Sequence, residues 1–181
     1  MTTPILALDS AGNPIRWIDY ERAAYLIAKG RLAWTPAESN IVLHGGINAA
    51  TDRQSTMSMP LIIAIKGKTG KPGLFKPRLT KKGLHRRDNN ICCYCGNHFK
   101  DDDLTADHVI PISRSGPTIW LNLVSACFPC NNRKRDRTPE EANMPMKYKS
   151  RIPNRAEYLY FINLNKAQCQ IDYLNNYMSK K

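Results

Sequence analysis

The residues of this chain that could do chemistry concentrate between Cys92 and Asn131, where two Cys-x-x-Cys pairs enclose the dipeptide Asp107-His108. The pairs are Cys92 with Cys95 and Cys127 with Cys130. Each pair presents two thiolates from one tight turn, and two such turns supply the four tetrahedral sulfur ligands of a structural zinc ion. Because 31 residues separate the pairs, one Zn²⁺ per chain would close a long loop around Asp107 and His108.

Two other interpretations of these cysteines are weaker. A redox dithiol of the thioredoxin type needs one pair beside a β-α-β pattern, which this sequence does not show. The alternative of four coincidental thiols is disfavoured by the paired spacing. Cys93 and Cys169 are interpreted as free thiols, and His98 is not needed as a ligand because four sulfurs already complete the set.

The overall charge favours a polyanionic partner. The 181 residues contain 27 Lys and Arg against 15 Asp and Glu, a formal net charge of +12. A basic protein without such a partner is the alternative. No apolar run approaches the ~20 residues of a membrane helix, and residues 1–10 do not resemble a signal peptide. We therefore expect a cytoplasmic protein with no membrane partner, in which cysteine pairs bind metal more readily than they form disulfides.

The N-terminal third contains the signals of a small α+β module. Apolar residues 4–8 and 14–18 around a Gly-Asn turn predict a hairpin. Asp19 is a suitable cap for a helix that ends near Lys29, followed by Gly30. Further strands are expected at residues 31–35, 40–44 and 61–65, and the polar stretch 44–58 is interpreted as a loop.

Residues 66–87 carry nine Lys or Arg and no acidic residue. Frequent Gly and Pro residues exclude a long helix before Thr80, so the sequence predicts a basic linker that leads into a short helix. A run of one sign beside the cysteine cluster favours contact with phosphate over a merely solvated face. The candidate contacts are Lys76, Arg78, Lys81 and Lys82.

Two more helices are expected after the cysteines. Thr138, Pro139 and Glu141 have the order of a helix start, with a capping Thr, a Pro at the first position and a Glu at the third. Apolar residues recur over 156–178, which predicts a packing helix at the C-terminus.

Together these motifs resemble the HNH endonuclease family, in the subgroup with four zinc-binding cysteines. The matching residues extend in order over a third of the chain. They are Arg87-Asp88, Cys92 to Gly96, Asp107 to Pro111, Ser113 to Gly116, Asn122 to Val124, Ala126-Cys127, Cys130 to Lys134 and Thr138 to Ala142. Residues 5–34 resemble the leader of stand-alone members more weakly.

The resemblance implies an α+β fold with a zinc-stabilised ββα-metal core, in which a two-strand hairpin carries Asp107-His108 and a helix begins near Cys130. The short apolar runs 109–112 and 120–124 are the predicted strands. We expect an N-terminal α+β module at 1–65, a basic linker at 66–82, the nuclease domain at 83–145 and a C-terminal helical extension at 146–181.

The family resemblance also implies the site. Its first His corresponds to His108, its middle Asn to Asn122 and its last His to Asn131, an Asn that other members also carry there. His108 is the expected general base, since a neutral imidazole can take a proton from water near pH 7. Asp107 and Asn131 are expected to hold one Mg²⁺ or Mn²⁺ through oxygen, and Asn122 is expected to orient the hairpin or His108.

The function that follows is a metal-dependent endonuclease that nicks double-stranded DNA. Lys134, one helical turn after Asn131, and Arg114 in the hairpin loop are further candidates for phosphate contact. The alternative is a catalytically silent, zinc-stabilised module that binds nucleic acid. Intact Asp107, His108 and Asn131 favour the enzyme, because binding alone requires none of them.

Overall fold

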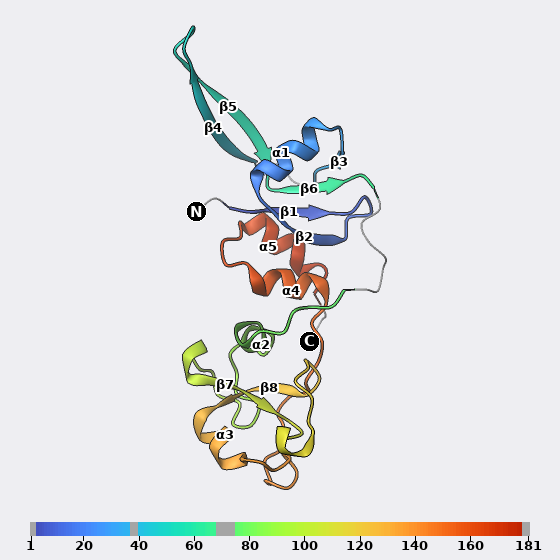
Figure 1. The fold of residues 1–181 in the computed structure, drawn as a ribbon, viewed down its shortest axis with the longest axis vertical. Coiled ribbons are helices and arrows are strands. Elements are labelled where there is room, and N and C mark those ends of the chain that lie inside the picture. Colours follow the sequence, from blue (N-terminus) through green and yellow to red (C-terminus); the bar gives the residue numbers. More distant parts are fainter. Residues whose placement is uncertain (1–2, 37–39, 68–74, 179–181) are drawn as a thin grey trace. The chain divides into compact units, whose positions relative to one another are not determined.

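The computed structural model describes residues 3–36, 40–67 and 75–178, which form two compact units (Figure 1). Residues 1–75 and 155–181 make up the first, here called the sheet unit. Residues 76–154 make up the second, the cysteine unit. Helices and small sheets occur in both, so the expected α+β class is confirmed. None of the helices in the described ranges is long and apolar enough to cross a membrane.

A four-stranded sheet with the order β2-β1-β6-β3 forms the centre of the sheet unit. Strands β1 (Ile5–Leu8) and β2 (Pro14–Ile18) form the predicted antiparallel hairpin. Its turn is closed by Asp9, whose Oδ1 accepts hydrogen bonds from the backbone N–H groups of Ala11 and Asn13. Strand β6 (Ile62–Ile65) runs parallel to β1, and β3 (Leu32–Trp34) pairs antiparallel with β6.

Helix α1 (Tyr20–Ala28) begins and ends as the sequence predicts. The Asp19 carboxylate accepts a hydrogen bond from the Arg22 N–H, which satisfies a donor that the helix itself cannot. The buried side chains Ala23 and Leu26 pack with Ile5 and Ala7 of β1. One face of the sheet is therefore covered by α1.

The other face of the sheet packs against the C-terminal residues (Figure 1). Alternate side chains of β1, Leu6 and Leu8, share a core with Leu159 and Leu174. The single helix expected over 156–178 is wrong: the chain forms α4 (Arg155–Ile162) and α5 (Gln168–Asn175). The break lets the two helices contact one another and lets Gln170 of α5 bond the main-chain oxygens of Pro4 and Leu61.

A long two-stranded ribbon extends from the sheet unit (Figure 1), formed by β4 (Asn40–Asn48) and β5 (Arg53–Pro60). The interpretation of 44–58 as a loop is therefore wrong. Its polar composition is typical of a loop, but β5 obtains its hydrogen bonds by pairing with β4, a partner that local composition does not reveal. Only its base is buried, where Met59 packs in the core beneath α1.

The cysteine unit contains the expected ββα order. Strand β7 (Leu104–His108) pairs antiparallel with β8 (Leu123–Cys127), and α3 (Phe128–Lys134) follows directly. The predicted strands at 109–112 and 120–124 are displaced. Pro111 interrupts the first run, Ile112–Arg114 form a 3-10 turn, and Gly116 approaches the Ile110 carbonyl so closely that a Cβ there would lie 1.8 Å from its oxygen.

Two further helix starts have different outcomes. Helix α2 (Lys81–Arg87) begins as predicted, with the Thr80 hydroxyl accepting from the Gly83 N–H. Thr138 and Glu141 do exchange the two hydrogen bonds of a capping box, but the chain turns at Asn143, which has a φ of 52°, and no helix follows. The local start signal is correct, and the helix prediction is wrong.

A buried ion pair joins α2 to β8. Arg87 bonds the adjacent Asp88 carboxylate and donates to the main-chain oxygens of Trp120 and Leu123. Asp88 in turn accepts from the Ser125 N–H. Each of these buried groups has a hydrogen-bond partner inside the core, so the pair fixes the position of β8 relative to α2.

Candidate active site

The four cysteines meet in the cysteine unit as their spacing predicts. The sulfur atoms of Cys92, Cys95, Cys127 and Cys130 all lie within 4.8 Å of one another. In a tetrahedral site with zinc–sulfur bonds of ~2.3 Å the sulfurs are about 3.8 Å apart, so a small contraction suffices to enclose the ion. Four convergent thiols with no nearby disulfide fit zinc in both number and chemistry.

Local structure explains why these thiols converge. Gly96 has a φ of +78°, which turns the chain directly after Cys95. Cys127 ends β8 and precedes α3, whose first turn carries Cys130. Burial raises the pKa of the Cys127 and Cys130 thiols, and a divalent cation among the four sulfurs favours their thiolate forms.

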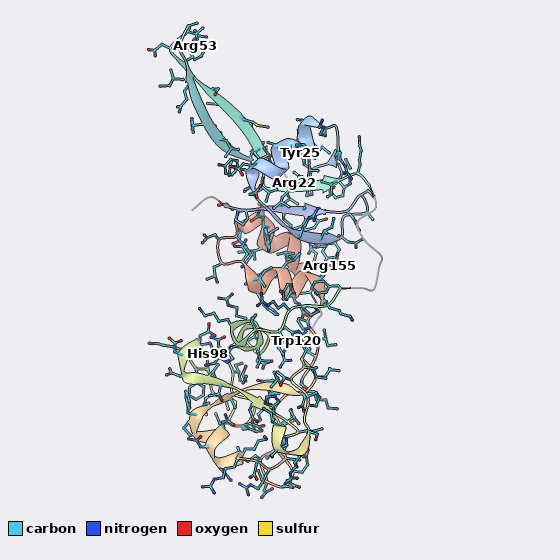
Figure 2. All side chains as sticks on the ribbon, viewed as in Figure 1. Arg22, Tyr25, Arg53, His98, Trp120 and Arg155 are labelled. Atoms are coloured by element: carbon cyan, nitrogen blue, oxygen red, sulfur yellow. The ribbon has the colours of Figure 1, made fainter. Side chains whose placement is uncertain are left out.

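The neighbouring candidates lie outside this cluster. Cys93 is buried, its Sγ donates to the main-chain oxygen of Tyr148 at 3.3 Å, and burial raises its pKa to about 11. His98 is exposed and belongs to a backbone bridge with Ile91 (Figure 2). Cys169 is in α5 of the other unit.

Asp107, His108 and Asn131 line one open hollow of about 320 Å³ in the cysteine unit. Asp107 and His108 end β7, and Asn131 lies in the middle of α3. Lys134 and Asp136 line the same hollow. The hairpin and the helix thus bring a carboxylate, an imidazole and an amide to one surface.

The Asp107 carboxylate is buried and bonded on both oxygens. Oδ1 lies 3.1 Å from the Lys134 ammonium, and Oδ2 accepts a hydrogen bond from the Tyr94 hydroxyl. Burial, together with the Asp107 carboxylate, raises the pKa of Tyr94, so the phenol stays protonated and continues to donate. Sequence reasoning missed Tyr94, although its position between Cys92 and Cys95 places it beside the site.

Lys134 differs from its sequence-based interpretation. It is fully buried, and its Nζ donates to the His108 main-chain oxygen at 2.7 Å as well as to Asp107. Lys134 lies one helical turn after Asn131, and both residues line the hollow, as expected. Its ammonium is engaged by the end of β7 and does not extend from the surface.

The His108 side chain is half-exposed at the hollow. Its Nε2 lies 3.0 Å from the Thr118 hydroxyl, in the loop between β7 and β8. This contact holds the ring in one orientation. Thr118 has no motif of its own, so only the folded loop reveals it as a partner.

The two asparagines occupy different surroundings. Asn122 is buried; its Oδ1 accepts from the Ile110 N–H, and its Nδ2 donates to the Ile110 and Pro117 carbonyls. It thereby closes the loop between the strands and does not line the hollow. Asn131 donates from Nδ2 to the Thr105 hydroxyl at 2.9 Å. Its Oδ1 is the atom of the amide that remains for a ligand.

The candidate phosphate contacts are mostly exposed. Lys76, Arg78, Lys81 and Lys82 have exposed side chains, while residues 68–74 of the basic stretch lie outside the described residues. Arg114 is also exposed and pairs with Glu141 at 2.6 Å. This contact lowers the pKa of the Glu141 carboxyl and raises that of the Arg114 guanidinium.

Comparison with known proteins agrees with the sequence motifs. The model of the HNH endonuclease family matches residues 92–147, which span the four cysteines, the β7–β8 hairpin and α3. No curated protein matches the chain. The match confirms the resemblance seen in the sequence, and it indicates a nuclease or nucleic-acid-binding function for this segment.

Proposed function

We propose that the protein, whose residues 92–147 match the model of the HNH endonuclease family, is a metal-dependent endonuclease that nicks double-stranded DNA. One observation carries the proposal: Asp107, His108 and Asn131 converge on one hollow, beside a cysteine cluster suited to structural zinc. Hydrolysis of a phosphodiester needs a base for water and a cation for the developing charge. His108 would be the base, and Asp107 and Asn131 would supply oxygen ligands for the cation.

His108 is the proposed general base. In the tautomer that donates from Nε2 to the Thr118 hydroxyl, the lone pair is on Nδ1, which can take the proton of the attacking water. A neutral imidazole can take a proton from water near neutral pH. Thr118 keeps the ring from turning, and Asn122 keeps the loop that carries Thr118 closed.

Asp107 and Asn131 are the proposed oxygen ligands of one Mg²⁺ or Mn²⁺. A carboxylate has about four acceptor positions, so its bonds to Lys134 and Tyr94 leave capacity for coordination. The Asn131 amide is oriented by Thr105, which leaves its oxygen available. Such a cation, when bound, neutralises negative charge on the scissile phosphate.

The basic side chains are the proposed contacts to the DNA backbone. Lys76, Arg78, Lys81, Lys82 and Arg114 are exposed and can reach phosphates. Lys134 is instead proposed to fix Asp107 and the His108 backbone, given its burial. Since one ββα site serves one strand at a time, the expected product is a nick.

A specific observation favours the alternative of a silent binding module. Asp107 is only 5% exposed, and both of its oxygens already accept hydrogen bonds, which is the environment of a structural carboxylate. In that case zinc would stabilise the fold, and the basic residues would bind nucleic acid without cleaving it. A measurement of DNA cleavage distinguishes the two functions.

The deciding experiment is nicking of supercoiled plasmid by zinc-loaded protein, with Mg²⁺ or Mn²⁺ and with EDTA. The identically purified His108→Ala protein controls for contaminating nuclease. The endonuclease predicts nicked circles only with the wild-type protein and added metal. Equal cleavage by both proteins, or none by either while both bind DNA, would favour the binding module.

A further inference from the structure

We propose that the sheet unit carries a second nucleic-acid-binding surface, which takes single-stranded DNA by stacking a base on Tyr25 and pairing phosphates with cations on either side. We call it the α1 surface; its residues are Arg16, Tyr20, Arg22, Tyr25 and Lys29. The inference takes DNA as the polymer from the proposed function. It assigns a different unit of the chain to strand binding, and binding can be measured without cleavage.

Tyr25 is the centre of this surface. Its side chain is 51% exposed on α1, although burial of an aromatic ring is strongly stabilising. The Arg22 guanidinium lies 5.1 Å from the ring centroid and the Lys29 ammonium 6.0 Å from it. Figure 2 shows Arg22 and Tyr25 close together on the same helix. The spacing i, i+3 and i+7 places all three on one side of α1.

In the part of the chain that the structure describes, no carboxylate pairs with these cations. Among the described residues, neither Arg22 nor Lys29 forms an ion pair within 4.0 Å. The nearby Asp19 carboxylate caps the helix through the Arg22 backbone N–H. Glu21 is exposed and likewise forms no ion pair in the described part of the chain. The two cations therefore remain available to an anionic ligand.

A hollow of about 470 Å³ continues the surface at the start of α1. Arg16 of β2 and Arg22 of α1 both line it, together with the aromatic side chains Trp17 and Tyr20. The indole of Trp17 is held by its Nε1, which donates to the Leu159 carbonyl at 2.9 Å. Because Arg22 both lines the hollow and contacts the Tyr25 ring, the two features adjoin at Arg22.

This combination suits a single strand better than a duplex or a peptide. Proteins that bind unpaired strands place cations along the backbone and stack bases on exposed aromatic rings. Bases within a duplex are already stacked on one another and cannot cover Tyr25. Lys29, the more distant cation on a flexible stem, can move to a phosphate while a base covers the ring. An acidic peptide would use the cations but has no base to stack on the ring.

The experiment measures binding by full-length, zinc-loaded His108→Ala protein, so that cleavage does not interfere. Fluorescence anisotropy with a labelled single-stranded 20-mer and with the same sequence as a duplex gives affinity against salt. The variants Arg22→Gln and Tyr25→Leu are made in this background. Arg53→Gln, an equal charge change at the far end of the ribbon (Figure 2), is the matched control.

We expect Tyr25→Leu to weaken single-strand binding on the order of tenfold and to leave duplex binding nearly unchanged. Arg22→Gln should lower the log-log salt slope for the single strand by about 0.7, the value of one phosphate contact. Arg53→Gln should change neither. Thermal unfolding of each variant checks that α1 remains folded.

Several results would overturn the proposal. Equal losses from Arg22→Gln and Arg53→Gln would show a general effect of charge, and unchanged binding by Tyr25→Leu would remove stacking. Competition by polyglutamate as effective as by unlabelled single strand would assign the surface to acidic peptides.

If wild-type protein fails to nick plasmid but Tyr25→Leu still loses single-strand affinity, the nuclease proposal fails and the proposed α1 surface is upheld.

Discussion

The ammonium of Lys134 lies 3.1 Å from Oδ1 of Asp107, and neither side chain is more than 6% exposed. The pair connects α3 to the end of β7, and a second hydrogen bond from Lys134 reaches the His108 carbonyl. A buried charge whose partner is removed is strongly destabilising, whereas a surface lysine contributes little. The role of Lys134 can therefore be measured through stability.

We predict that Lys134→Met lowers the free energy of unfolding by about 3–5 kcal/mol, because Asp107 is left buried without its cation. Urea unfolding of zinc-loaded protein measures this change, with the exposed Lys82→Met as control. The double variant Asp107→Asn/Lys134→Met should lose less than the sum of the single variants. Unchanged stability with a smaller salt slope for DNA binding would return Lys134 to the role of a phosphate contact.

The zinc cluster is predicted to be structural. Elemental analysis should find one zinc per chain, and Cys127→Ser should lose it and unfold at a lower urea concentration, since zinc binding is coupled to folding. Cys169→Ser, which changes a thiol in the other unit, should keep both the metal and the stability. Folded protein that nicks DNA without any zinc would contradict the structural role.

The proposed roles of His108 and Asn131 predict different dependence of the nicking rate on metal concentration. His108→Ala should cost 10²-fold or more of the nicking rate while DNA affinity and zinc content stay unchanged. Asn131→Ala should instead shift the curve of nicking rate against Mg²⁺ concentration to higher metal, and Asn131→His should recover activity best with Mn²⁺. Identical metal curves for wild type and Asn131→Ala would exclude Asn131 as a ligand.

DNA affinity should depend steeply on salt through the exposed basic residues before α2. Changing Lys76, Arg78, Lys81 and Lys82 to Gln together should reduce the log-log slope by about 0.9 per lost phosphate contact on duplex DNA. The control exchanges Lys and Arg at the same four positions and keeps their charge. If both quadruple variants retain the wild-type slope, these side chains form only a solvated face.

A buried histidine predicts loss of stability in acid. His85 is fully buried, and its Nε2 has no hydrogen-bond partner among the described residues. Burial lowers its pKa from 6.5 despite the Asp101 carboxylate 3.2 Å from Nδ1. The unfolded chain then binds a proton more readily than the folded one, so this contribution is present above pH 6.5 and is lost as the pH falls from 6.5 through the lower pKa of the folded state.

The measurement is the free energy of unfolding between pH 7 and pH 5 for wild type and His85→Gln at constant zinc. The variant should lose less stability over this range, and the exposed His44→Gln should behave as wild type. A parallel decline in wild type and His85→Gln would show that the acid sensitivity comes from other groups.

What local sequence determines is visible in α1 and in the cysteines. A helix start depends on one cap residue and on the periodicity of the next few side chains, so Asp19 and the apolar face predict α1 closely. The two Cys-x-x-Cys turns are equally local, and four clustered cysteine sulfurs are typical of a zinc site. Motif order across residues 87–142 was sufficient to predict the resemblance to the HNH endonuclease family, which the family match over residues 92–147 confirms.

Only the tertiary structure decided the pairings between distant residues. The β4–β5 ribbon, the displacement of β7 and β8, and the packing of α4 and α5 on the N-terminal sheet all depend on partners far along the chain. Lys134 shows the reason most directly. From its sequence it is one more cation among many, and only the approach of β7 to α3 brings Asp107 and the His108 carbonyl within hydrogen-bonding distance of its ammonium. Burial then makes that contact stronger than exposure to solvent would, because the charge has no water to replace its partners.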